Sequence, residues 1–334
     1  MHLELVIPAL LRAPDPPPAA LPALELLLAR GRRGHGHAGN LETWLCRAFG
    51  LEDTSPQRPC VPAGALTALA VGLDPGAHSW LRADPVHLRA DRDRVLLMPG
   101  QALSITANEA QDLAAALTPL LAGKFMLHAV RHDQWCLRIQ EQGPIDIGAK
   151  PPIDLAGADI DPHLPPKQWH LLLTEIQMAL YSHPVNTARE RRGEPVINSL
   201  WLWGAGTAPA ASGPWNSIGA TDPVALGLAR SAGMRHRDPG RGADEWLARA
   251  PEEGRHLLVL DGLRGVHALS DPGTLARRMQ ELESNWFAPL LAALKSRRIG
   301  MLTVRVPETG ASFETVRGDL NRFWRRPRRL ASYA

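Results

Sequence analysis

The stretch His256-Leu-Leu-Val-Leu-Asp261 decides the fold, because it contains an uninterrupted apolar run that is followed by an aspartate. Such a run is typical of a strand that is buried on both faces of a sheet. A helix pattern over Pro272–Lys295 follows it, and Ile299–Val306 has the pattern of a further strand. Strand, helix and strand in succession predict an α/β fold with a mostly parallel sheet and flanking helices.

The N-terminal segment shows the same alternation. Leu3–Leu11 predicts a strand or a short buried segment, and Leu21–Arg32 predicts a helix. Gly31–Gly39 predicts a flexible loop because of its glycines. Asn40 is suited to cap the helix that follows this loop. A second buried strand is predicted for Ile197–Trp203, and we expect it to share one sheet with Leu3–Leu11.

The residue pattern changes at Trp80, after which short segments with strand-like patterns are separated by Asp and Gly. A helix capped by Asn108 is predicted to extend to about Leu121. Phe125–Val130 and Trp135–Ile139 then have the pattern of a hairpin. This mixture of short strands and one helix is typical of an α+β lobe.

The domain prediction follows from these patterns. Residues 1–73 and 167–334 are expected to form one α/β core domain, with residues 74–166 as an inserted α+β lobe. A long helix pattern over Gln168–Arg192 begins the second part of the core, and Pro184 should break or kink it.

Composition limits the class of protein. The chain of 334 residues has 45% hydrophobic residues, which is ample for a buried core, and a net charge of only +3. Cys46, Cys60 and Cys136 lie far apart, which excludes a thiolate zinc knuckle and argues against a disulfide framework. The sequence has neither a signal-peptide pattern nor an apolar run long enough to cross a membrane, so a cytoplasmic protein without a membrane partner is expected.

Two motifs place glycine or polar residues at the end of a predicted strand and at a predicted helix break. Trp201-Leu-Trp-Gly-Ala-Gly206 either lets the backbone approach a ligand or forms a tight turn at the end of a strand. His183-Pro-Val-Asn186 with Arg189 is either a structural kink or a site that offers an arginine fork to a carboxylate or phosphate. The residues predicted to bind such an anionic ligand are Arg82, Arg138, His183, Asn186, Arg189, Asn198, Trp201 and Trp203.

Candidate catalytic and metal-binding residues are sparse. Asp261 ends a core strand, where α/β active sites lie, but aspartate is equally a turn-forming residue. His35 and His37 alternate in a glycine loop, and two imidazoles alone are a weak metal site. No GxSxG, Walker or HExxH motif occurs. The sequence therefore assigns no catalytic residue and no metal ligand, and no cofactor is expected.

The C-terminal segment Arg322-Phe-Trp-Arg-Arg-Pro-Arg-Arg329 interleaves two aromatic residues with five arginines. It could stack on bases and contact phosphates, or bind an acidic partner. Alternatively, Phe323 and Trp324 pack back on the core and the arginines are simply solvated. The residues predicted to bind a partner are Arg322, Phe323, Trp324, Arg325 and Arg326.

Several of these segments resemble known families. One family is the RpfE-type bacterial regulatory proteins; the other is the archaeal-type cofactor-independent phosphoglycerate mutases of the alkaline phosphatase superfamily. The mutase resemblance rests on HPVN, on N-x-x-W-x-W-G-x-G and on Ala220–Gly233, and it implies a truncated, alkaline phosphatase-like α/β fold. The segments that resemble the RpfE-type proteins are Trp80–Leu88, Asn108–Leu121, Ser182–Arg189, Ile197–Gly206 and Phe323–Pro327.

The sequence departs from the mutases where their metals and nucleophile lie. The first strand of those mutases ends in a metal-binding Asp-Gly, whereas the corresponding segment here is Leu5–Leu11 and contains neither residue. Leu263–Asp271 lacks their Asp…Gly-His motif, and Val304–Gly310 lacks their terminal Asp-His pair. A two-metal site needs several carboxylates and imidazoles, so these departures predict a chain without metal-dependent catalysis.

The function predicted from the sequence is a non-catalytic, phosphoglycerate-mutase-like regulatory or scaffold protein that acts by protein binding. The RpfE-type resemblance implies the exonuclease RecJ as a partner. One alternative is a cofactor-independent phosphoglycerate mutase or phosphatase with a rearranged site. A second is a nucleic-acid-associated protein that uses its basic C-terminal segment.

Overall fold

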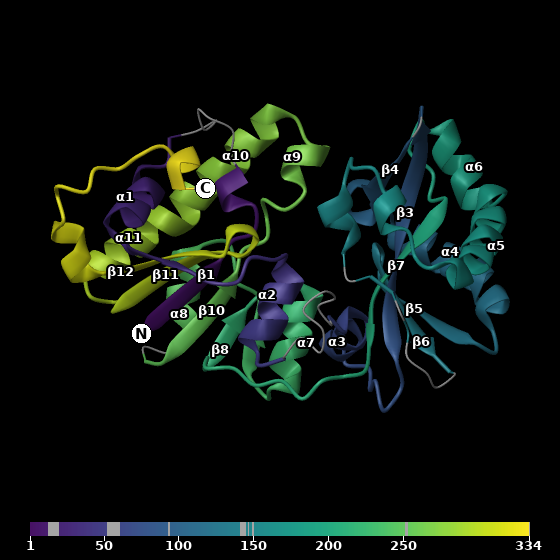
Figure 1. The fold of residues 1–334 in the computed structure, drawn as a ribbon, viewed down its shortest axis with the longest axis horizontal. Helices are drawn as coiled ribbons and strands as arrows, with labels where there is room; N and C mark the ends of the chain where they lie inside the picture. The colour runs from purple at the N-terminus through teal and green to yellow at the C-terminus, as the bar shows by residue number, and fades with distance from the viewer. Residues whose placement is uncertain are drawn as a thin grey trace. The chain divides into compact units, whose positions relative to one another are not determined.

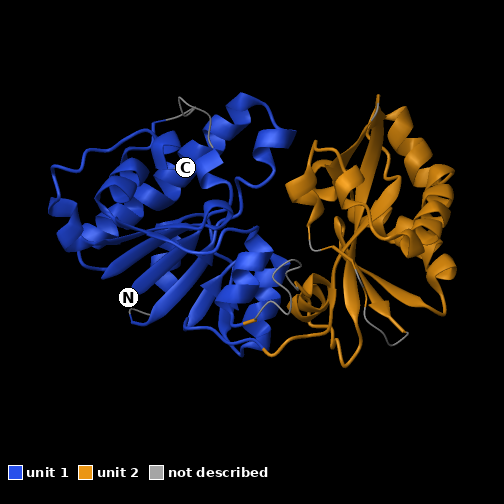
Figure 2. Cartoon of the chain, viewed as in Figure 1, with its two compact units in different colours: residues 1–50, 211–334 blue, residues 51–210 orange. Residues whose placement is uncertain are grey.

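The protein is described here by a computed structural model, which covers residues 1–12, 20–51, 61–92, 94–140, 145, 147–148, 150–250 and 253–333. The chain forms two compact units, Met1–Gly50 with Ala211–Ala334 and Leu51–Ala210, coloured separately in Figure 2. Each unit has its own sheet, and the two are described in turn. Among the described helices, none has the length and apolar character that crossing a membrane requires.

Unit 1 contains a seven-stranded sheet in the order β2-β12-β11-β1-β10-β8-β9 (Figure 1). The five strands from β11 to β9 are mutually parallel, whereas β12 and β2 add to the edge in antiparallel pairing. The strands are β1 (His2–Val6), β2 (Arg32–His35), β8 (Ser217–Gly219), β9 (Arg235–Arg237), β10 (Arg255–Val259), β11 (Met301–Val306) and β12 (Ala311–Val316).

Helices cover both faces of this sheet. Leu3 and Leu5 of β1 point to one face and pack with residues of α1, α8, α10 and α11 in the main core. The other face carries Glu4, which accepts a hydrogen bond from Trp215; the Trp215 ring contacts Phe49 at the end of α2, and α7 packs beside α2. The helices are α1 (Pro22–Arg30), α2 (Leu41–Ala48), α7 (Pro223–Ser231), α8 (Ala243–Arg249), α9 (Val266–Leu269), α10 (Pro272–Leu282), the π-helical turn η6 (Glu283–Phe287) and α11 (Ala288–Lys295), with 3₁₀ turns η1 (Leu10–Arg12), η7 (Pro307–Thr309), η8 (Arg317–Asn321) and η9 (Leu330–Tyr333).

Unit 2 contains a five-stranded antiparallel sheet in which β4, β3, β6 and β5 follow one another and β7 also pairs with β3. Helices α4 and α5 pack on the face with Leu81, Leu137 and Leu202, whereas α3 covers the opposite face, with Trp80 and Cys136. The strands are β3 (Trp80–Asp91), β4 (Arg94–Pro99), β5 (Phe125–Arg131), β6 (Gln134–Ile139) and β7 (Ser199–Gly206). The helices are α3 (Ala63–Ala70), α4 (Ala107–Leu121), α5 (His170–Tyr181) and α6 (Pro184–Arg191), with 3₁₀ turns η2 (Gly100–Ala102), η3 (Pro152–Leu155), η4 (Asp161–His163) and η5 (Lys167–Trp169).

The α/β class with a mostly parallel sheet and a separate α+β part is confirmed. Among the local predictions, the Asn40 cap is confirmed because its side chain accepts from the Thr43 backbone N–H. The predicted hairpin is β5 and β6, and the helix break before Pro184 separates α5 from α6. Of the three cysteines, Cys60 lies outside the described residues; Cys46 and Cys136 are buried and not disulfide-bonded.

Three local predictions were wrong. Ile197–Trp203 does not share a sheet with Leu3–Leu11, because β7 pairs antiparallel with β3 in unit 2. The cap of α4 is Thr106, which forms a reciprocal capping box with Glu109, rather than Asn108. Part of Gly31–Gly39 is not a flexible loop, since β2 is the edge strand beside β12.

The boundaries between the two compact units differ from the predicted domain boundaries. The structure separates the chain after Gly50 and after Ala210, whereas the sequence predicted boundaries at 73/74 and 166/167. The cause is pairing between distant segments: α3 packs on β3 and β7, and β7 pairs with β3, so both sides of the predicted lobe are drawn into unit 2. The division into residues 1–73 with 167–334 and an inserted lobe of residues 74–166 stays a prediction.

Candidate active site

A cavity of about 210 Å³ opens at the carboxyl ends of β8 and β10 in unit 1. After β8 the chain passes into α7, beside α2, whereas after β10 it passes toward α10, on the opposite face of the sheet. Neighbouring loops that diverge in this way leave a crevice outside the strand ends, which is where open α/β sheets bind ligands. The side chains that give this crevice its polar character are Thr221, Arg241, Asp261, Arg278, Glu281 and Asn285.

The two strand ends place Thr221 and Asp261 at the crevice. Thr221 is exposed, because the next residue, Asp222, is the one that turns inward and caps α7 by accepting from the Ala225 backbone N–H at 2.9 Å. Asp261 follows the last residues of β10 and is half-buried. A hydroxyl and a carboxylate thus lie where the parallel strands end.

Two arginines complete the charged lining. Arg241 lies in the turn before α8, where its backbone N–H donates to Glu245 at 3.0 Å and so fixes the turn. Arg278 is on α10 and pairs with Glu281 at 3.1 Å, with both side chains about half exposed. A surface ion pair of this kind is weak, so an anionic ligand can compete with Glu281 for the guanidinium. The crevice can therefore bind phosphate or carboxylate oxygens.

The described residues do not supply the metal ligands that the mutase resemblance implies. No group of three or more His, Cys, Asp and Glu side chains comes together within the described ranges. At the end of β1, Ala9 adopts a left-handed φ of 62° and its backbone N–H donates to Glu308 at 3.0 Å. Asp271 caps α10 by accepting a hydrogen bond from the Thr274 backbone N–H. The pKa of His267 is lowered, first by burial and then by the positive charge of Arg12. The described side chains thus do not fit a two-metal centre.

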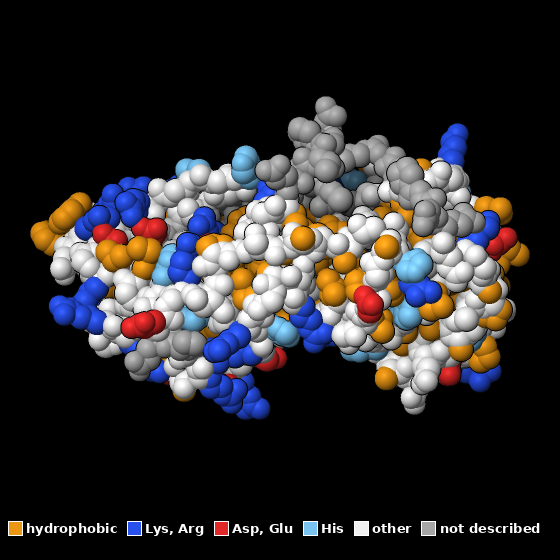
Figure 3. All heavy atoms as spheres, turned by 90° about the horizontal axis from the view of Figure 1, so that it is seen from below, with side chains coloured by type: hydrophobic (Ala, Val, Ile, Leu, Met, Phe, Trp, Pro, Cys, Tyr) orange, Lys and Arg blue, Asp and Glu red, His pale blue; other side chains and the backbone are white. Residues whose placement is uncertain are grey.

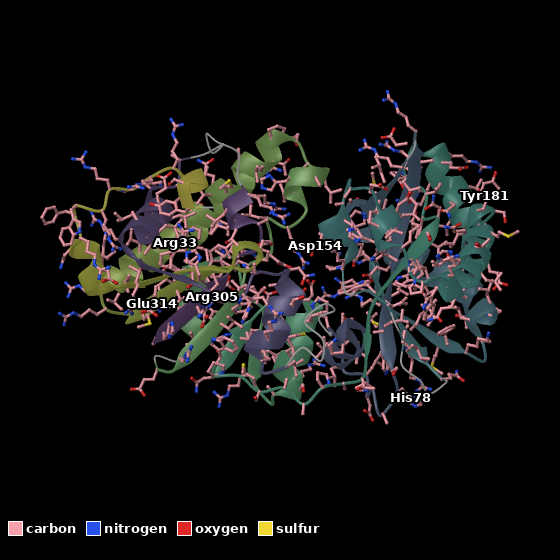
Figure 4. All side chains as sticks on the ribbon, in the orientation of Figure 1. Arg33, His78, Asp154, Tyr181, Arg305 and Glu314 are labelled. Carbon is pink, nitrogen blue, oxygen red and sulfur yellow. The ribbon has the colours of Figure 1, made fainter. Side chains whose placement is uncertain are left out.

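A second cavity, of about 310 Å³, lies on the α2 face of the sheet. Its lining also contains four charged residues, but its central carboxylate, Glu4, already has partners in Arg305, Arg255 and Trp215 (Arg305 is labelled in Figure 4). It also lies beside the middle of β1 rather than at the strand ends. We therefore place the candidate site in the smaller crevice, where the strand ends converge.

The residues predicted to bind a ligand lie in unit 2 and do not form one group. Arg82 is buried on the α3 face, where it pairs with Asp84 at 2.7 Å and donates to Thr67 at 3.1 Å. Trp203 lies 5.3 Å from the Arg82 guanidinium and donates to the second Asp84 oxygen at 2.8 Å. These polar atoms are therefore bonded to one another, inside the unit.

The α6 residues lie on the other side of the sheet, next to α4. Asn186 uses its whole amide on backbone, bonding Leu180 O, Ile197 O and Ile197 N at 2.7–2.8 Å. Arg189 is fully buried and donates to Pro195 O and to Glu109. This network holds the chain between α5 and β7 in place, as expected for a structural kink.

The remaining predicted ligand residues are distributed over unit 2. His183 caps α6, accepting from the Val185 backbone N–H at 3.3 Å. Asn198 bonds the backbone of Leu88 twice, and Trp201 donates to Lys150 O. The half-buried Arg138 differs, since no described group bonds its buried Nε. Ligand binding by these eight residues stays a prediction.

The predicted partner-binding residues lie together on the loop after η8 in unit 1. Arg322 and Arg325 donate to backbone carbonyls at the end of α1, whereas Phe323, Trp324 and Arg326 are exposed. The two aromatic residues therefore do not pack back on the core.

The crevice residues were missed by the sequence prediction, with the exception of Asp261. Thr221, Arg241 and Arg278 come from a strand end, a turn and a helix that are far apart in the sequence, and no motif spacing links them. Thr221 and Asp261 each lie two residues after the end of a strand, but only Asp261 follows an apolar run that the sequence makes visible.

Comparison with known proteins shows distant similarity to phosphoglycerate mutases. No family model matches the chain. Over 233 residues, or 65% of this chain, it is 26% identical to a probable 2,3-bisphosphoglycerate-independent phosphoglycerate mutase from Geobacter sulfurreducens. Over 111 residues it is 32% identical to a mutase of the same description from Methanothrix thermoacetophila. The matches span 57% and 27% of the lengths of these curated relatives.

The fold is also found in a solved structure, that of the PH0037 protein from Pyrococcus horikoshii. The TM-score is 0.58 at 17% sequence identity, with 99% of this chain and 91% of the other covered. This structural similarity therefore supports the α/β fold of the chain.

The comparisons overturn one prediction from the sequence. A non-catalytic regulatory or scaffold protein was expected, but the relatives that the chain matches are described as phosphoglycerate mutases. The departures at the metal positions were given too much weight, because a site can be built from other residues on the same fold. The alternative, a mutase or phosphatase with a rearranged site, agrees better with these relatives.

Proposed function

We propose that this chain is an enzyme that transfers or hydrolyses the phosphoryl group of a small phosphorylated carboxylic acid of the phosphoglycerate type. The observation that carries the proposal is the 233-residue similarity to the Geobacter mutase. The crevice at the ends of β8 and β10 supports it, because it joins two arginines, a hydroxyl and two carboxylates at a cavity of about 210 Å³. Pockets for drug-sized ligands are larger, roughly 300–1,000 Å³, so a compact acid suits it.

Each side chain of the crevice has a role in this proposal. Arg241 and Arg278 bind the phosphate and carboxylate oxygens, since guanidinium forks match both groups. The exposed Thr221 hydroxyl attacks the phosphorus while the bond from phosphorus to the substrate oxygen breaks, and the Asp261 carboxylate takes the proton of this hydroxyl and passes it to the departing alkoxide. Transfer of the phosphoryl group from Thr221 to another hydroxyl of the glycerate, or to water, restores the threonine. The predicted cytoplasmic location suits such a substrate, while the RpfE-type identity and a RecJ partner stay separate proposals.

The test is an assay of the purified full-length chain with 2- and 3-phosphoglycerate, reading both their interconversion and the release of inorganic phosphate. Parallel reactions contain manganese or a chelator. We expect turnover in at least one readout. Arg278→Gln and Asp261→Asn should each lower kcat/KM by about 10²–10³, the usual effect of removing one group that stabilises charge in the transition state.

Arg277→Gln is the matched control, because Arg277 is the neighbouring exposed arginine on α10 and is not part of the cavity lining. It should keep the wild-type kcat/KM. Absence of turnover in every condition would overturn the proposed function. Turnover that Arg278→Gln and Asp261→Asn leave unchanged would overturn the placement of the site.

A further inference from the structure

The loop of residues 322–329, between η8 and η9, exposes two large aromatic side chains. Phe323 is 77% and Trp324 is 67% exposed, and their rings meet edge to face at 5.3 Å. Figure 3 shows hydrophobic side chains beside Lys and Arg side chains at the left end of unit 1, where Figure 1 draws this loop. Aromatic rings of this size are usually at least partly covered, so an adjacent exposed pair indicates a binding surface.

The loop is fixed to the body of unit 1 by its own arginines. Arg322 and Arg325 donate to Arg30 O at 3.2 Å and to Gly31 O at 2.9 Å, carbonyls at the end of α1 that have no partner inside the helix. Arg322 also pairs with Asp319 at 2.8 Å. Beyond the loop, Leu330 is fully buried in the main core. The two rings are thus held outward on an anchored loop.

The region around this loop carries a local excess of positive charge. Residues 317–333 contain six arginines and one aspartate, a net charge of +5, while the whole chain has only +3. The rest of the chain is therefore net negative. Arg326 and Arg328 follow the two aromatic residues in the sequence and are exposed, as are Arg325 and Arg329.

We propose that the loop 322–329 binds single-stranded nucleic acid. Bases stack on Phe323 and Trp324, and Arg326 and Arg328 contact the phosphates on either side. Stacking platforms between cations are how proteins bind single strands without reading the sequence. A duplex keeps its bases stacked on one another, so it cannot use the rings. All the charged side chains of the loop are cations, which matches an evenly spaced polyanion better than the mixed surface of a folded protein.

The experiment is a titration of fluorescein-labelled oligothymidylate of 15 nucleotides with the full-length chain, followed by fluorescence anisotropy over a series of NaCl concentrations. The chain should bind the single strand more tightly than a duplex of equal length. Phe323→Ala and Trp324→Ala should each weaken binding about tenfold, the effect expected for the loss of one stacked base. Arg326→Gln with Arg328→Gln should reduce the slope of log K against log salt by about 1.4.

The controls are matched residues in unit 2. Tyr181→Ala removes an 88% exposed aromatic ring (labelled in Figure 4), and Arg89→Gln with Arg191→Gln removes two exposed arginines. These variants should bind as the wild type does. Equal binding of the alanine variants and the wild type would overturn the proposal, as would a preference for polyglutamate, which would identify an acidic protein as the partner. Because the altered side chains are exposed, unchanged thermal unfolding is expected and verifies the fold of each variant.

Discussion

The polar residues that the sequence singled out in unit 2 and those that line the crevice in unit 1 have opposite surroundings. In unit 2, the antiparallel sheet buries Arg82, Asp84 and Arg189, and their polar atoms are bonded within the unit. In unit 1, the parallel strands end at a crevice where Thr221 and Arg278 remain accessible. A buried arginine with a partner stabilises the fold, whereas an accessible arginine that lines the crevice is able to bind a ligand. The difference teaches that prominent polar motifs in a sequence can belong to the scaffold.

The largest change in the free energy of unfolding is expected for a substitution of Asp84. Asp84→Asn removes the charge that balances Arg82 in a site where both side chains are at most 3% exposed. An uncompensated buried charge costs about 3–5 kcal/mol, so urea denaturation should show a loss of this size. Asp91→Asn, in an exposed pair on the same strand, should change the free energy of unfolding by less than about 1 kcal/mol. Equal effects of the two substitutions would contradict a structural role for the buried pair.

A medium effect is expected in the parallel sheet. A Cβ at Gly219 would overlap Leu258 Cδ2 and lie 2.5 Å from the Trp246 ring, so Gly219→Ala should destabilise the chain by about 1–3 kcal/mol through overpacking. At Gly318 a Cβ would meet nothing within 4 Å, and Gly318→Ala should have an effect within about 0.5 kcal/mol. Thermal unfolding measures both. If Gly219→Ala were as stable as the wild type, the side chains of Leu258 and Trp246 would not pack closely against Gly219.

The smallest effect depends on pH. Burial by itself would raise the pKa of Glu109, but the Thr106 backbone N–H, Arg189 and Arg192 together hold that pKa below its usual range. A depressed carboxyl pKa stabilises the fold above the unfolded pKa, about 4.3, and this contribution is lost as pH falls through the folded value. Glu109→Gln should therefore cost about 1 kcal/mol at pH 7 and progressively less below about pH 4.

The control for this pH series is Glu190→Gln, which alters an exposed carboxylate on α6. It should leave the unfolding free energy within about 0.5 kcal/mol of the wild type over the same range. A Glu109→Gln difference that stays constant down to pH 2 would show that the ionised carboxylate is not the source of the stabilisation.

The sequence was sufficient for elements with a local signal. The apolar run before Asp261, the Asn40 cap and the break at Pro184 depend on neighbouring residues, and the structure has a strand, a capped helix and a helix break there. The partner of β7 was not predictable in the same way. Leu200 and Leu202 face one side and Trp201 and Trp203 the other, and a strand that is apolar on both faces fits a parallel or an antiparallel sheet equally well.

The candidate site was predicted less well than the fold, for a related reason. Asp261 could be identified as a candidate because it follows an apolar strand. Arg241 and Arg278 can be identified as site residues only in the folded structure, where the turn before α8 and helix α10 bring them to the same crevice. Arg82 and Arg189 were predicted to bind a ligand because they lie in recognisable sequence motifs, but both are buried.

The most direct test of the contrast between the units is a crystal of the full-length chain soaked in 3-phosphoglycerate. We predict density for the ligand in the unit 1 crevice, with its phosphate or carboxylate oxygens within hydrogen-bond distance of Arg241 or Arg278 and close to Thr221. Density beside Arg138 or Arg189 in unit 2, with the crevice empty, would contradict the account and would return the site to the residues that the sequence first indicated.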